Sequence, residues 1–65
     1  MIRVRRLNNT EIMLNCELIE FIEETPDTVV TLTTGKKFVV KESMEEISQK
    51  IIAYKREIYS LKIKE

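Results

Sequence analysis

Residues 18–43 constrain the fold of this chain more than any other stretch, because they hold three β-rich segments separated by two turn signals. β-Branched and aromatic residues recur in each segment, and such side chains suit the pleated, partly buried surface of a sheet. In residues 25–28, Pro26 stands at the second turn position, where its fixed φ fits a type I or type II turn. Gly35, the single glycine, marks the second turn and is expected to take a positive φ. We therefore predict three antiparallel strands joined by two hairpins, a β-meander.

A further hairpin is predicted ahead of the meander. Residues 2–5 alternate apolar and basic side chains, which gives a short strand with one face of each kind. The pattern breaks at residues 8–9, two asparagines that tolerate left-handed geometry, and alternation resumes in residues 10–14. Asn15 is then suited to capping a single turn before the chain re-enters the sheet. The strand-rich part of the chain therefore spans residues 1–42 and holds four to five strands.

An amphipathic helix is predicted over residues 43–62, approximately. Ser43 and Glu46 have the S-x-x-E spacing of a capping box, in which each side chain accepts the backbone amide of the other residue. The apolar positions that follow are spaced three, four, three, four and three apart, as on one helix face: Met44, Ile47, Ile51, Tyr54, Ile58 and Leu61. Ile52 and Tyr59 broaden this face into a stripe of the kind that packs on a sheet.

The distal part of this helix is expected to project beyond the sheet. About twenty helical residues span ~30 Å, whereas typical strands reach only ~17–20 Å. The candidate partner-binding residues on this overhang are Tyr54, Ile58 and Leu61. A second candidate surface is a polar face that carries Arg3, Arg5 and Glu20. The alternative for the polar face is a charge-balanced, solvated surface in which the arginines pair with Glu11 or with the glutamates around Glu20.

Together these elements predict one α+β domain over residues 1–65, a small antiparallel β-meander followed by one C-terminal helix. The meander strands carry apolar side chains on both faces, whereas the chain offers a single helix to cover them. The second face must therefore curl on itself as a small barrel or meet another subunit. A domain of this size buries only about 60% of the surface that its unfolded chain exposes, and association is one remedy. We accordingly expect a homo-oligomer.

Composition and motifs argue against catalysis and metal binding. One cysteine, Cys16, and no histidine exclude an internal disulfide and a His/Cys metal site. The adjacent carboxylates at residues 23–24 and 45–46 diverge, because neighbours in a strand or a helix point in different directions. No positioned nucleophile, acid–base pair or cofactor cradle is apparent. We expect a non-enzymatic protein without a metal, a cofactor or a small-molecule substrate.

Charge and hydropathy also bear on location and partners. The first residues lack the long apolar core of a signal peptide, and no run approaches the ~20 apolar residues of a membrane span. The lone cysteine fits a reducing compartment. Eleven basic and eleven acidic residues cancel, which argues against a protein that mainly wraps a polyphosphate backbone. A cytoplasmic protein without a membrane span is expected.

The combined pattern resembles the FlbD family of small flagellar proteins, from residue 2 to about residue 56. The resemblance is carried by Leu7-Asn8, by Asn15 with residues 17–20, and by residues 23–28, 32–33, 35–37, 39–42 and 51–56. Asn9 and Cys16 depart from it, since a glycine and a proline are typical at these positions. The resemblance implies a non-enzymatic accessory of bacterial flagellar and swarming motility that acts by protein–protein interaction. It implies association with a motor or stator component that generates torque, at the inner face of the membrane.

A second functional class stays open. A meander followed by a C-terminal helix is also similar to the small RNA-binding carbon-storage regulators. In that alternative the contact patch on the sheet would consist of Arg3, Arg5, Arg6, Lys36 and Lys37. Zero net charge and the lack of exposed aromatic residues between the basic ones count against RNA binding. Steep salt dependence of binding to RNA would support it.

Overall fold

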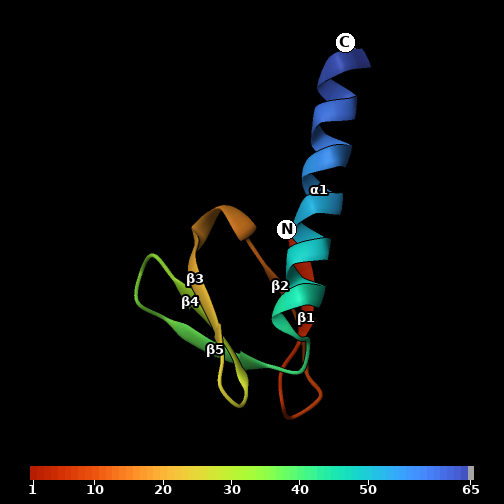
Figure 1. Cartoon of the computed structure of the whole chain (residues 1–65). Coiled ribbons are helices and arrows are strands. Elements are labelled where there is room, and N and C mark those ends of the chain that lie inside the picture. The colour runs from red at the N-terminus through yellow and green to blue at the C-terminus, as the bar shows by residue number, and fades with distance from the viewer. Residues whose placement is uncertain (65) are drawn as a thin grey trace.

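The computed structural model describes the backbone of residues 1–64 and the side chains of residues 1–60. Five strands and a single-turn 3₁₀ helix precede one long helix (Figure 1). In chain order the elements are β1 (Ile2–Arg5), β2 (Glu11–Leu14), η1 (Cys16–Leu18), β3 (Ile19–Glu24), β4 (Thr28–Leu32), β5 (Lys37–Val40) and α1 (Met44–Lys64). The α+β class, the strand content and the C-terminal helix predicted from the sequence are confirmed.

The alternating pattern at the N-terminus forms the predicted hairpin. β1 and β2 pair antiparallel, with Ile2 opposite Leu14 and Arg5 opposite Glu11. Asn9 takes a φ of 70° in the connecting turn, which is the left-handed geometry expected of an asparagine there. At the end of β2, the Asn15 side chain accepts a hydrogen bond from the Glu17 amide at 3.0 Å and so caps η1. An asparagine on each side, Asn9 in the turn before β2 and Asn15 after it, therefore determines where β2 begins and ends.

The meander is also present, with strand order β3-β4-β5. Gly35 has a φ of 92°, and its amide donates to the Leu32 carbonyl at 2.9 Å, as the second turn signal predicted. The first turn lies at residues 25–27 between β3 and β4, where the sequence placed it, and its Thr25–Pro26 peptide bond is cis.

The five strands do not close into a barrel. β1 and β2 form one sheet and β3, β4 and β5 form another. A single bridge between Arg6 and Val40, together with a 2.8 Å hydrogen bond from the Lys41 amide to the Arg5 carbonyl, joins the sheets at one corner. Within the described residues, β2 and β3 each pair with only one other strand. Of the two ways to cover the second face, barrel closure is therefore not used.

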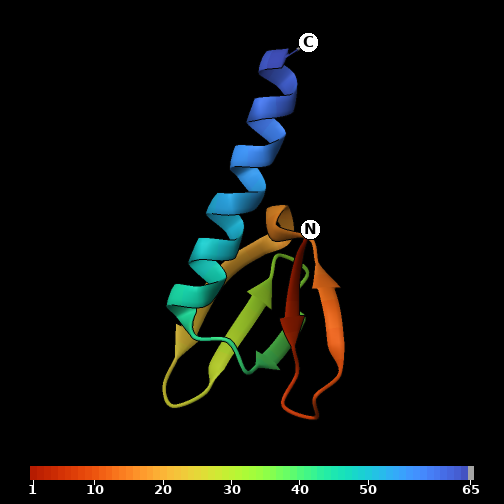
Figure 2. The same ribbon diagram turned by 90° about the vertical axis from the view of Figure 1, so that its right-hand side faces the viewer.

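Helix α1 begins at the predicted capping box. The Ser43 amide donates to Glu46 Oε1 at 3.0 Å, and the Glu46 amide donates to Ser43 Oγ at 3.1 Å. The next amide, that of Met44, donates to Glu24 Oε1 of β3 at 2.7 Å, which fixes the start of the helix against the second sheet. Figure 2 shows this first part of α1 crossing in front of β3, while its distal part extends beyond the strands.

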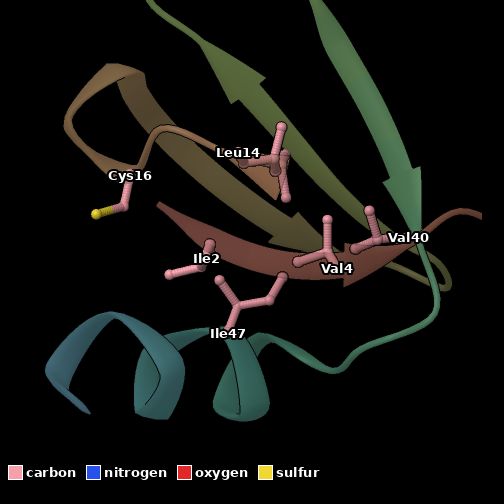
Figure 3. Close-up of a cluster of buried hydrophobic side chains, with 7 residues drawn as sticks. Ile2, Val4, Leu14, Cys16, Val40 and Ile47 are labelled. Carbon is pink, nitrogen blue, oxygen red and sulfur yellow. The ribbon is translucent and has the colours of Figure 1, made fainter. Parts of the chain in front are cut away.

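The core lies between the two sheets and the first turns of α1. Its buried apolar residues are Ile2, Val4, Leu14, Cys16, Val30, Val40 and Ile47. Figure 3 shows Ile47 pointing from α1 toward Ile2 and Val4 of β1. Farther along the helix, Ile51 and Tyr54 are half-buried against this core. Ile52 and Tyr59 are exposed, so the prediction that they broaden the packed stripe was wrong.

Candidate functional site

The distal half of α1 projects well beyond the strands (Figure 1). The described part of the molecule measures 41 × 22 × 19 Å, and the long dimension follows this helix. Among the predicted partner-binding residues, Tyr54 packs against the core and Ile58 is half-buried. Tyr59, which was assigned to the packed stripe, is 62% exposed on the projection. The side chain of Leu61, the third predicted residue, lies outside the described residues.

The projection begins beside η1, where a small hollow of about 190 Å³ lies between α1 and η1. Its lining residues are Glu17, Lys55, Ile58 and Tyr59. Lys55 Nζ lies 3.7 Å from Glu17 Oε1 across the opening. Both charges are solvent-exposed, so this ion pair stabilises the fold by less than about 1 kcal/mol. The ion pair joins η1, which Asn15 caps, to α1 next to the exposed Tyr59.

The polar face predicted from Arg3, Arg5 and Glu20 is divided between the two sheets. Arg5 is held firmly, because its amide donates to both carboxylate oxygens of Glu42 at 2.9 and 3.1 Å and its Nη2 lies 3.8 Å from Glu11. Arg3 is exposed on the same strand. Glu20 is exposed on β3, where the register shifts, and in the described part of the chain no ion pair joins it to either arginine. Of the predicted pairings, the one with Glu11 is formed.

A second cluster of positive charge lies where the β1–β2 turn meets the start of β5. The guanidinium carbon of Arg6 lies 5.2 Å from the centre of the Phe38 ring, and Lys36 Nζ lies 5.3 Å from it. Both distances are within the range of cation–π attraction. Together with Lys37 these residues line an open hollow of about 350 Å³. We call this set, Arg6, Lys36, Lys37 and Phe38, the basic hollow.

The sequence indicated only part of the basic hollow. The predicted patch grouped its three cations with Arg3 and Arg5, which do not line the hollow, and it included no aromatic residue among the basic ones. Phe38 lies next to these cations but is half-buried, so the predicted lack of exposed aromatic residues between the basic ones is not contradicted. Its position after two lysines was visible in the sequence, but the approach of Arg6 depends on the bridge from Arg6 to Val40, which no local pattern indicates.

An apolar groove follows the seam between β3 and α1. It has a volume of about 390 Å³, and its apolar lining consists of Ile22, Met44, Ile51 and Ile52. In residues 1–60, no group of three or more acidic, cysteine or histidine side chains is placed to hold a metal ion. As far as its residues are described, α1 is not apolar enough over a sufficient length to cross a membrane.

Comparison with known proteins gives one match. The family model FlbD, described as flagellar and swarming motility proteins, matches residues 1–59. No curated protein and no solved structure matches the chain. The matched range contains both sheets, the basic hollow and α1 as far as Tyr59.

Proposed function

The chain belongs to the FlbD family of flagellar and swarming motility proteins, and on that basis we propose that it is a non-enzymatic accessory of bacterial flagellar motility that acts by binding other proteins. Its partner in this proposal is a motor or stator component, and its action is to support motor power. It works at the cytoplasmic face of the membrane. The observation that carries the proposal is the projection of α1 beyond the sheets with an exposed tyrosine on it (Figure 1).

The projection has the properties of a contact surface. Tyrosine is enriched in protein interfaces, because its ring offers a large apolar area and its hydroxyl a hydrogen bond. Tyr59 and the half-buried Ile58 both line the small hollow near η1. The base of the helix is fixed by Ile47 in the core and by the capping box. A surface on an element anchored in this way loses little conformational entropy on binding.

The double variant Ile58→Asp/Tyr59→Asp is expected to abolish motility in soft agar while keeping the circular dichroism spectrum of the parent. Two carboxylates would replace apolar contact area, and neither position belongs to the buried core. Tyr54 is left unchanged because its packing against the core would mix a folding effect with a binding effect. The matched control is Gln49→Asp/Ala53→Asp, which adds the same charge at exposed positions of α1. Normal motility of the folded Ile58/Tyr59 variant would contradict the proposal.

Filament staining of the same cells separates the two ways in which motility can fail. Cells that carry normal filaments but rotate them weakly, measured with beads tethered to the filament, support an action on motor power. Cells without filaments contradict that part of the proposal and assign the chain to flagellar assembly. The control variant should be normal in both measurements.

We also propose that the chain forms a homo-oligomer through the outer face of the β3-β4-β5 sheet. Strand register places Val29 between Glu23 and Val39 on this face, and the exposed Phe21 lies opposite Thr31, two positions farther along β4. Light scattering across a concentration series should give a mass above the 7.7 kDa of one chain. The Phe21→Lys variant should return that mass to one chain, because each interface would then bury an unpaired charge. A monomer at every concentration would contradict this arrangement.

A further inference from the structure

We propose that the basic hollow binds an acidic segment of a partner protein, a short stretch in which carboxylates flank an apolar side chain. This site is separate from the α1 projection and adds a chemically defined contact to it. The proposal concerns Arg6, Lys36, Lys37 and Phe38. Leu7, Asn8 and Val39 also line the hollow.

Backbone contacts of two separate segments, the end of β1 and the start of β5, hold these residues in place. Arg6 follows β1 and is fixed by its bridge to Val40 and by a 2.9 Å hydrogen bond from its amide to the Thr10 carbonyl. Lys36 follows the Gly35 turn, and its carbonyl accepts the Leu32 amide at 2.9 Å. Phe38 lies opposite Val30 in the sheet and packs against the core. The Phe38 ring is therefore fixed in position, and the cations of Arg6 and Lys36 that lie over it are preorganised for binding an anion.

The charges of the hollow are all of one sign. Its lining holds three cations and no carboxylate. The ion pairs found among the described residues involve Arg5 with Glu11 and Lys55 with Glu17, so none of these three cations is neutralised by one. Lys41, which follows directly after β5, donates to the Asn9 side chain instead. Carboxylates from outside would meet guanidinium and ammonium donors that need little rearrangement, and such charge-assisted hydrogen bonds are stronger than neutral ones.

The apolar lining favours a protein segment over a nucleic acid. Leu7, which is 52% exposed, lines the hollow and lies outside the sheet face proposed for the homo-oligomer. A phosphate backbone gains nothing from this side chain, whereas an apolar residue between two carboxylates would bury against it. Single-stranded nucleic acids usually stack bases on aromatic rings, but the space over the Phe38 ring is taken by Arg6 and Lys36. Three cations also give fewer phosphate contacts than many nucleic-acid sites use.

The test is a titration of the isotope-labelled full chain, followed by NMR, with a blocked peptide that has two glutamates on each side of one leucine. Saturable shifts are expected at the backbone amides of Leu7 and residues 36–39, with the distal part of α1 unchanged. The Lys36→Glu/Lys37→Glu variant should bind at least tenfold more weakly, because carboxylates would then face carboxylates. Absence of saturable shifts, or shifts centred elsewhere, would overturn the proposal.

Two controls make the result specific. The Lys50→Glu/Arg56→Glu variant changes the net charge by the same amount on α1, outside the basic hollow, and it should bind the peptide as the parent does. Equal weakening in both variants would show a general effect of net charge and would overturn the assignment to the hollow. The second control replaces the peptide by a short oligouridylate. Tighter binding of the oligouridylate at the same amides, with a steep salt dependence, would overturn the protein-segment proposal in favour of RNA.

Discussion

Replacing Ile47 by Ala is expected to lower the free energy of unfolding by about 2–5 kcal/mol, the usual cost of truncating a fully buried aliphatic side chain. Ile47 is 0% exposed and, among the described residues, is the one α1 side chain in the fully buried core. A domain of this length is typically stable by only ~3–10 kcal/mol in total. The substitution therefore removes a large share of the stability and releases the base of α1 from β1.

Urea unfolding followed by circular dichroism measures this effect. The matched control is Ile52→Ala, which removes the same atoms from the same helix at a side chain that is 43% exposed. We expect the control to cost less than about 1 kcal/mol, because an exposed position leaves no cavity. Equal destabilisation by the two substitutions would contradict the assignment of Ile47 as the anchor of α1.

The Thr31→Val variant is expected to be more stable than the parent, by about 1–3 kcal/mol, the cost of burying a hydroxyl without a hydrogen bond. Thr31 is 3% exposed in the central strand β4, and its Oγ1 has no hydrogen-bond partner in the described part of the chain. The register places it between Phe21 of β3 and Lys37 of β5. Valine keeps the branched shape, removes the polar atom and is favoured in strands.

Thermal and urea unfolding of Thr31→Val should both move in the stabilising direction. Thr33→Val is the control, because Thr33 is exposed in the following turn and its hydroxyl is open to water. That substitution should change stability by no more than about 0.5 kcal/mol. A loss of stability in Thr31→Val would mean that the hydroxyl makes a favourable interaction, and it would contradict the assignment of Thr31 Oγ1 as an unsatisfied buried atom.

The features that the sequence predicted well are those decided by neighbouring residues. The capping box joins Ser43 and Glu46, which are three positions apart, and both of its hydrogen bonds are formed. The positive φ of Gly35 follows from the conformational freedom of glycine, and that of Asn9 from the tolerance of asparagine for left-handed geometry. Alternation of apolar residues in the same way located the first hairpin. The resemblance to the FlbD family, read from short segments, agrees with the match over residues 1–59.

The features that the sequence left open depend on contacts between distant residues. Apolar side chains on both faces of the meander left open whether the strands close into a barrel. In the described residues β2 and β3 do not pair with each other, so the sheets stay open. The same limit applies to the helix. Ile52 and Tyr59 fit an apolar stripe by spacing alone, but only the position of α1 against β1 and β3 shows which side chains it buries.

The candidate binding surfaces show most clearly which features follow from the sequence and which depend on the tertiary structure. The sequence by itself determined that α1 would extend past the strands, because helix rise and strand length fix their relative reach. It also determined which residues carry positive charge. Only the tertiary structure placed Arg6 and Lys36 over the Phe38 ring, since the corner bridge between Arg6 and Val40 joins residues 34 positions apart (40 − 6). Local propensities act over a few residues, whereas such a contact forms only when the whole core has packed.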